Sequence, residues 1–153
     1  MIKILEILRF AGCGLGIFLA YSYGETPEEI LRIMTPWFVG SIAGLSAIEG
    51  LFFAREASAE KGFEQGSNYQ RQNSFWFFAV AIVALIIYFA GWNEYANITI
   101  VLILCFFLIM SAANHTYSIF IDKNIKWQNV IRPFLTLLFI LVFWYPVTAI
   151  LFR

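Results

Sequence analysis

Three polar side chains, Glu49, Asn114 and His115, stand inside long apolar stretches of this chain. An ionisable group within the hydrocarbon of a membrane is costly, and such groups usually face a bundle interior or a water-filled space where they serve function. A carboxylate and an imidazole brought together could bind a proton, a cation or a polar headgroup. Glu49 and His115 are therefore the first candidates for a binding site.

Spacing adds further residues to this candidate site. Four polar residues recur at i, i+4, i+7 and i+11 and so share one helix face: Ser111, His115, Ser118 and Asp122. Glu56 and Glu60 share a face with Glu49 if the helix that carries Glu49 continues beyond the apolar stretch. Arginines are available as counter-charges: Arg9, Arg55 and Arg132. The predicted binding residues are Glu49, Arg55, Glu56, Ser111, Asn114, His115, Asp122 and Arg132.

A structural alternative remains open, in which Glu49 and His115 form a hydrogen-bonded clamp that fixes helix register. No metal site is predicted, because the chain has a single His and lacks a Glu-x-x-His pair. No cofactor motif and no nucleophile turn is visible. Whether the protein is an enzyme stays open, and the sequence favours a non-enzyme.

The elements that must position these residues are membrane spans. Of the 153 residues, 61% are hydrophobic and 13% charged, whereas a soluble domain carries about 25% charged residues. Ten basic and ten acidic residues leave no net charge to attract nucleic acid. We predict one all-α domain over residues 1–153, a polytopic membrane helix bundle in the lipid bilayer. Its five spans are Ile2–Tyr23, Trp37–Ala54, Phe75–Trp92, Ile98–Ser118 and Pro133–Phe152.

The first span is the weakest, because Lys3, Glu6 and Arg9 occupy its first turns. The count falls to four if it does not cross, and a cleaved signal peptide is the rival interpretation. Between the first two spans, Thr26-Pro27 predicts a short surface helix within Gly24–Met34, and Thr35-Pro36 predicts a new start. The segment 55–73 reads as a helical extension broken at Gly62 and Gly66.

Cytoplasmic loops hold the excess of Lys and Arg. One side carries eight of them: Lys3, Arg9, Arg55, Lys61, Arg71, Lys123, Lys126 and Arg132. The other side carries Arg32 and Arg153. This bias predicts an inner-membrane protein with a cytoplasmic N-terminus, a cytoplasmic 55–73 loop and a C-terminus outside.

Small residues predict where helices approach closely. Gly12, Gly16 and Ala20 form one ridge, and Gly40, Gly44 and Ala47 or Gly50 form another. We expect the first two helices to meet there, with a homo-oligomer seam as the alternative, and we expect Gly44→Leu to disturb the fold or the assembly.

Several short motifs together resemble a family of small uncharacterised prokaryotic multi-pass inner-membrane proteins, a domain of unknown function. They are Glu49-Gly50, Arg55-Glu56, the run from Gly62 to Tyr69, the run from Asn114 to Ser118, and Arg132-Pro133-Phe134. The resemblance covers roughly Trp37 to Leu138. It implies a membrane protein of prokaryotes and transfers no catalytic role.

Two hypotheses of function follow. The first is a small binding or transport module that engages a small solute or a cation through a polar site in the cytoplasmic half of the bundle. The second is an accessory or scaffold protein that docks a partner through the 55–73 loop, where Glu64, Tyr69 and Arg71 would matter.

Overall fold

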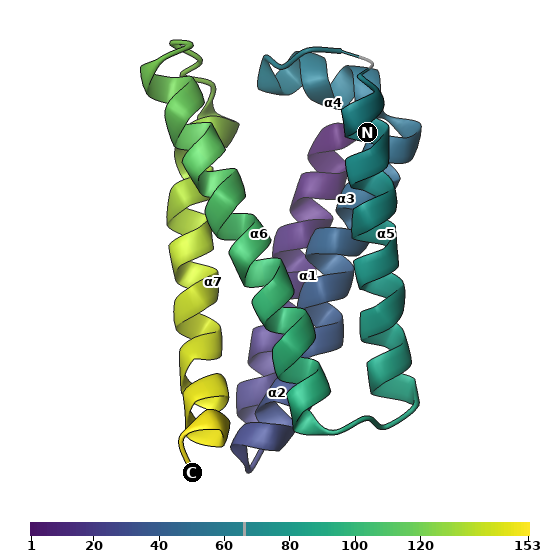
Figure 1. Cartoon of the computed structure of the whole chain (residues 1–153), viewed down its shortest axis with the longest axis vertical. Coiled ribbons are helices and arrows are strands. Elements are labelled where there is room, and N and C mark those ends of the chain that lie inside the picture. The colour runs from purple at the N-terminus through teal and green to yellow at the C-terminus, as the bar shows by residue number, and fades with distance from the viewer. Residues whose placement is uncertain (66) are drawn as a thin grey trace.

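The computed structural model describes residues 1–65 and 67–153, and within these the chain is all-α with no strand. Seven α-helices and one π-helical segment follow one another (Figure 1). They are α1 (Ile2–Tyr23), α2 (Pro27–Val39), η1 (Gly40–Gly44), α3 (Leu45–Phe52), α4 (Ala54–Lys61), α5 (Asn68–Phe89), α6 (Glu94–Phe120) and α7 (Trp127–Leu151).

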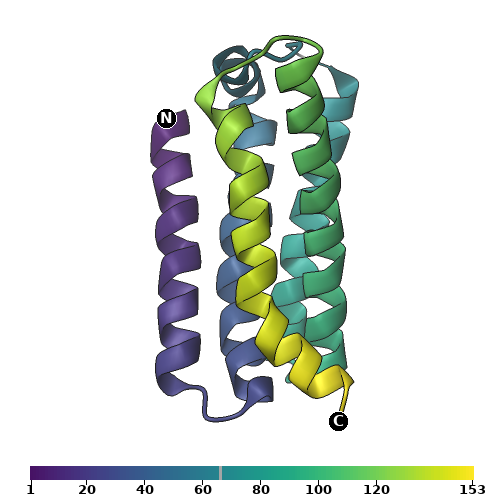
Figure 2. The same ribbon diagram turned by 90° about the vertical axis from the view of Figure 1, so that its left-hand side faces the viewer.

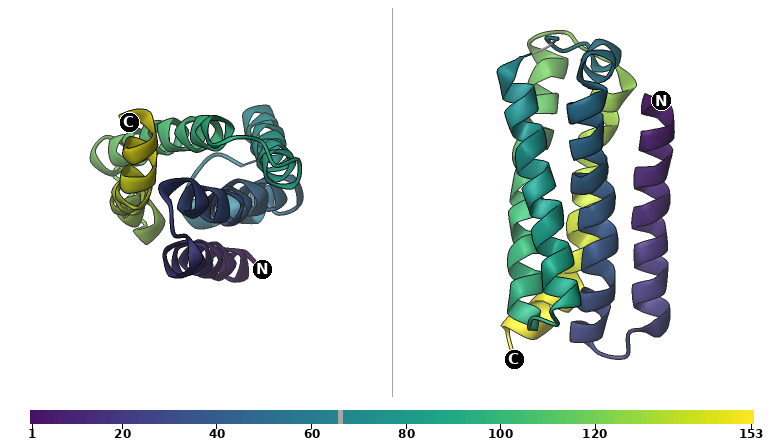
Figure 3. Two further views of the ribbon diagram at one scale, coloured as in Figure 1. Left: turned by 90° about the horizontal axis from the view of Figure 1, so that it is seen from below. Right: turned by 90° about the vertical axis from the view of Figure 1, so that its right-hand side faces the viewer.

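The helices form a bundle of antiparallel rods, with α2, η1 and α3 joined end to end into one of them (Figures 1 and 2). The N-terminus lies at the end where α4 crosses the bundle, and the C-terminus lies at the opposite end. We call these the α4 end and the far end. Seen from below, α1 stands at the edge of the bundle beside α2 (Figure 3).

Four segments in the described part of the chain are long and apolar enough to cross a membrane: Pro27–Phe52, Asn68–Phe89, Glu94–Phe120 and Trp127–Leu151. The chain is therefore a multi-pass membrane protein with a helical bundle, as its composition predicts. The 22-residue α1 packs along this bundle without belonging to that set. Its crossing of the membrane stays a prediction.

The continuous rod formed by α2, η1 and α3, which we call the second rod, is longer than the predicted second span. Thr26 caps α2 by accepting from the backbone N–H of Glu29 at 3.3 Å, and the helix then runs through Pro36 without a new start. The prediction of a separate surface helix before Thr35 is wrong. The hydroxyl of Thr35 donates to the Leu31 carbonyl at 2.7 Å, and η1 follows directly, a wider turn of the kind that accommodates a local break in the helical hydrogen bonds.

A proline also lies inside α7. Pro146 has no N–H to donate to Val142, four residues earlier. The Tyr21 hydroxyl of α1 donates to that Val142 carbonyl instead, at 2.8 Å. Figure 2 shows the last turns of α7 leaving the direction of the rest of the helix, and a proline inside a helix is a usual cause of such a kink.

The seam between α1 and the second rod is close, as the small residues of α1 predict. A Cβ on Gly12 would lie 2.0 Å from Ser41 Oγ, and one on Gly16 would lie 2.4 Å from Trp37 Cβ. The second ridge faces elsewhere: Gly50 and Gly44 point to Ser74 and Ala81 of α5, and Gly40 meets open space. The predicted close contact between the first two helices is therefore confirmed, and it uses the small residues of α1 only.

The apolar core is densest toward the far end. Phe38 is 1% exposed and meets Phe139 and Phe143 edge-on, with ring centroids 4.6 and 4.9 Å apart. Leu31 and Met34 are fully buried beside it. Aromatic rings prefer such edge-to-face contacts, so this layer fixes how α2 and α7 cross.

At the α4 end the second rod does not continue straight. Phe53 leaves helical geometry (φ −126°, ψ 23°), and α4 turns across the bundle. Glu56 and Glu60 therefore do not lie on the same helix face as Glu49. The prediction that they share this face, which required a continuous helix, is wrong. The predicted break at Gly62 is confirmed, since Gly62 ends α4 with φ 72°. The predicted break at Gly66 lies outside the described residues.

Candidate functional site

Glu49 is the centre of a buried charge cluster. It lies on α3 and is 5% exposed. Arg9 of α1 donates to its Oε2 at 2.7 Å and also reaches the Leu45 carbonyl at 3.2 Å. Lys61 of α4 forms an ion pair with the other oxygen, Oε1. Two cations from different helices thus share one carboxylate, and Arg9 is one of the three arginines predicted as possible counter-charges.

Lys61 reaches Glu49 because α4 folds back after Phe53 and ends at Lys61. The end of α4 is held down from the other side of the bundle. Asn124 donates to the Lys61 carbonyl at 3.0 Å, and Lys126 donates to the Ala59 carbonyl at 2.8 Å. Burial lowers the pKa of the Lys61 ammonium, while Glu49 opposes this and the charge of Arg132 adds to it.

His115 of α6 has a different partner. Its Nδ1 lies 2.7 Å from Asn129 Oδ1 on α7, and Asn129 Nδ2 donates to the Asn124 carbonyl at 3.0 Å. Because the amide nitrogen is occupied in that way, Oδ1 must accept and His115 Nδ1 carries the proton. The expected hydrogen bond between Glu49 and His115 is not formed, and each side chain is fixed by its own partners.

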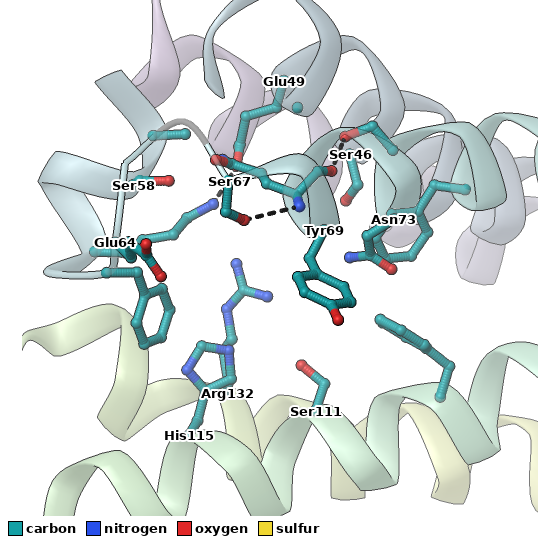
Figure 4. A pocket seen from close by; sticks show the side chains of 18 residues that line it. Ser46, Glu49, Ser58, Glu64, Ser67, Tyr69, Asn73, Ser111, His115 and Arg132 are labelled. Atoms are coloured by element: carbon teal, nitrogen blue, oxygen red, sulfur yellow. Dashed lines mark hydrogen bonds and ion pairs between the residues drawn. The ribbon is translucent and has the colours of Figure 1, made fainter. Parts of the chain in front are cut away.

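Both side chains nevertheless line one cavity of about 650 Å³ at the α4 end (Figure 4). Its walls come from α3, α4, α5, α6, α7 and the connection before α5. Hydroxyl and amide groups are frequent among them: Ser46, Ser58, Ser67, Tyr69, Gln70, Asn73, Ser74 and Ser111. The cavity therefore offers many hydrogen-bond donors around a few charges.

Arg132 occupies a distinct position in this cavity. It is partly buried on α7, and its guanidinium points into the cavity between His115 and the segment of Ser67 (Figure 4). Among the described residues it has neither an ion pair nor a side-chain hydrogen bond. Guanidinium groups carry five donors arranged to grip an oxyanion, so this is the group in the cavity best suited to hold a ligand.

The remaining predicted residues lie elsewhere. Asn114 is exposed, because it precedes His115 by one residue and so lies about 100° around α6 from it. Arg55 and Glu56 are exposed on α4. Asp122 is exposed beyond α6 and accepts from Ser118 at 2.9 Å. Of the eight predicted residues, the cavity wall contains four: Glu49, Ser111, His115 and Arg132.

Sequence reasoning missed Lys61, Asn129 and two serines of the cavity wall, Ser58 of α4 and Ser67 of the α4–α5 connection. The sequence identifies Lys61 only as one of the eight basic residues on the predicted cytoplasmic side. Asn129 precedes Arg132 by three residues and so shares its helix face, which is the signal that could have found it. In the parts of the chain with described positions, no three His, Cys, Asp or Glu side chains are placed to hold a metal ion.

The sequence profile of one family, a family of unknown function (DUF6790), matches residues 2–151. The chain belongs to this family. The resemblance to a domain of unknown function is thus confirmed, and the match extends beyond the predicted Trp37–Leu138 to include α1. A prokaryotic origin stays a prediction. No curated protein and no solved structure matches the chain, so the site must be interpreted from its own geometry.

Proposed function

We propose that this protein is a small membrane-embedded binding module, which holds an anionic solute in the cavity at the α4 end. The observation that carries the proposal is the guanidinium of Arg132, which points into the cavity without a partner among the described residues. A partly buried cation without an ion pair or side-chain hydrogen bond is costly, although less so than a fully buried one. A bound anion would remove that cost.

The charges around the cavity favour an anion as the ligand. They argue against a cation, which the sequence analysis names as a possible ligand. The wall carries Glu49 and Glu64 against Lys61 and Arg132, and Arg9 stands behind Glu49. The wall thus carries two cations and two carboxylates, with Arg9 and Glu6 behind it. Glu49 is already bound by Lys61 and Arg9, which leaves Arg132 as the cation of the wall without an ion pair among the described residues. Glu64 is exposed, where solvent screens its charge. An incoming cation would find no free buried carboxylate.

Binding is better supported than transport. The cavity lies at the α4 end, and partway along the bundle Phe38 of α2 packs edge-on against Phe139 and Phe143 of α7, so an apolar aromatic layer stands between these two helices on the way to the far end. We place the α4 end in the cytoplasm of a prokaryotic cell, because the eight basic residues that outnumber Arg32 and Arg153 all belong to segments at this end.

The scaffold hypothesis has weaker support. Tyr69, Glu64 and Arg71 are exposed, as a docking surface requires. However, α4 and the start of α5 are tied to the bundle by Lys126, Asn124 and the bond from Gln70 to the Ala54 carbonyl at 2.9 Å. This segment is thus built as one wall of the cavity.

The test is the thermal stability of purified protein in phosphate, sulfate and chloride at constant ionic strength, with Mg²⁺ and Na⁺ series beside them. Wild type and Arg55→Gln, an exposed arginine outside the cavity, should be stabilised by an oxyanion. A ligand at 100 times its Kd stabilises by about 2.7 kcal/mol. Arg132→Gln should lose the shift, and Arg132→Lys should keep part of it because lysine retains charge without the planar fork.

Two outcomes would overturn the proposal. One is an anion-induced shift of equal size in wild type and Arg132→Gln. The other is stabilisation by cations alone, with loss of that effect in Glu49→Gln.

A further inference from the structure

A second, smaller cavity adjoins the first at Arg132. It measures about 90 Å³ and lies between α1 and α7, with α3, η1 and α6 behind it. Three residues line both cavities: Ser46, Ser111 and Arg132. The two spaces are therefore neighbours across one cationic side chain.

The two cavities differ in chemistry. The smaller one is walled largely by apolar side chains, which are Phe10, Cys13, Leu108, Ile131, Leu135 and Phe139. Its polar residues, Glu6, Arg9 and Gln128, lie toward the α4 end of α1 and α7. Arg132 thus separates a space rich in hydroxyl and amide groups from an apolar one.

The smaller cavity has an apolar mouth. Phe10 of α1 and Trp127 of α7 line it and are 43% and 54% exposed. In a membrane-spanning bundle such exposed aromatic groups face lipid or its interface. An apolar cavity of about 150 Å³ holds a benzene molecule. The present cavity is smaller, at about 90 Å³, so it suits only a short apolar segment. The rest of a longer chain would continue between α1 and α7 into the bilayer.

From these observations we infer that the ligand is an amphiphile with a phosphate group, whose phosphate lies at Arg132 in the larger cavity and whose apolar group lies in the smaller one. This inference rests on the proposed function, since it needs an anion at Arg132. Ser58, Ser67 and Ser111 line the same cavity as Arg132 and offer further hydroxyl donors for the several oxygens of a tetrahedral phosphate.

The experiment compares inorganic phosphate with hexyl phosphate, by competition and thermal stability, on protein in micelles of a maltoside detergent, which contains no phosphate. Hexyl phosphate should bind wild type at least tenfold more tightly, since each buried methylene adds favourable transfer free energy. Leu135→Trp, which fills the smaller cavity, should erase this tenfold advantage and leave inorganic phosphate binding unchanged.

The controls separate the two levels of the proposal. Leu137→Trp changes an exposed residue of α7 outside both cavities and should behave as wild type. Cys13→Leu fills the smaller cavity from α1 and should repeat the result of Leu135→Trp. Arg132→Gln should weaken both phosphates equally.

Equal affinity of wild type for the two phosphates would overturn the amphiphile and leave the anion site standing. The same conclusion holds if Leu135→Trp and Leu137→Trp both keep the full advantage of hexyl phosphate, because the tail would then lie elsewhere. If neither phosphate binds wild type, or Arg132→Gln changes nothing, the proposed function itself fails.

A final arm identifies the source of the amphiphile. Protein in the same micelles with added phosphatidylglycerol should resist displacement by hexyl phosphate if the natural occupant is a membrane phospholipid. If the added lipid does not compete, the phosphate amphiphile comes from the aqueous side.

Discussion

The two ends of the bundle satisfy their polar groups in different ways. Toward the far end, Thr35, Thr99 and Thr148 donate to carbonyls four residues earlier in their own helices. At the α4 end, polar groups pair across elements, as Glu49 does with α1 and α4 and His115 does with α7.

This difference has a consequence for how each end depends on assembly. A hydroxyl bonded within its own helix is satisfied before that helix meets another, so it specifies nothing about packing. A bond between elements exists only in the assembled bundle. The far end is held mainly by apolar contact, with the bond from Tyr21 to Val142 and the ion pair of Glu28 with Arg153 as polar contacts between its elements. The α4 end is held mainly by polar contacts that also leave a cavity.

The largest expected effect is that of breaking the charge cluster. Glu49→Gln removes the carboxylate and leaves Arg9 and Lys61 without a counter-charge. We expect a loss of about 3–5 kcal/mol in the free energy of unfolding, measured by denaturation in detergent.

The matched change at the far end is Glu28→Gln, which breaks the ion pair with Arg153, whose side chain is 57% exposed. It should leave stability unchanged within error, because exposed pairs are screened and mobile. Equal losses in the two variants would refute the contrast between the ends.

A smaller effect is expected where α1 is pressed against the second rod, since this seam is what brings Arg9 to Glu49. Gly16→Ala places a Cβ 2.4 Å from Trp37 Cβ, and such overpacking costs about 1–3 kcal/mol. Gly14→Ala, two residues away with nothing within 4 Å, should be neutral or slightly stabilising in the same unfolding measurement. If both variants match wild type, α1 is not held by this seam.

The smallest effect concerns Lys61. Its pKa is lowered by burial, so between that lowered pKa and the ordinary lysine pKa of about 10.4 the unfolded chain binds more protons than the folded protein. Stability from this group therefore rises with pH across that window. Denaturation of wild type and Lys61→Gln between pH 8 and about 10.5 should reveal a more positive slope for wild type; parallel slopes would show that Lys61 titrates normally.

The sequence specifies the class and most of the rods, because long apolar runs have few stable solutions in lipid other than helices. Boundaries were harder. Pro36 and Pro133 read as helix starts, yet α2 and α7 run through them, since neighbouring groups in a bundle can satisfy the carbonyl that a proline leaves free.

The cost of burying polar groups in lipid was enough to predict Glu49 and His115 as site residues. It did not predict Lys61 and Asn129, which bind them. The turn at Phe53 has neither Gly nor Pro to mark it, so local propensity gave no reason to expect Lys61 beside Glu49. The bond between His115 and Asn129 depends on the register of α6 against α7, which is set by packing along their whole lengths.

The hydrogen bond from Tyr21 to Val142 joins the first helix to the last across 121 residues. At a synthesis rate of about 5–20 residues per second, Val142 of α7 is added several seconds after Tyr21 of α1. The space between these two helices is thus the last part of the bundle to be enclosed. A lipid that belongs there can be captured while the chain is still being made, and need not enter a finished protein.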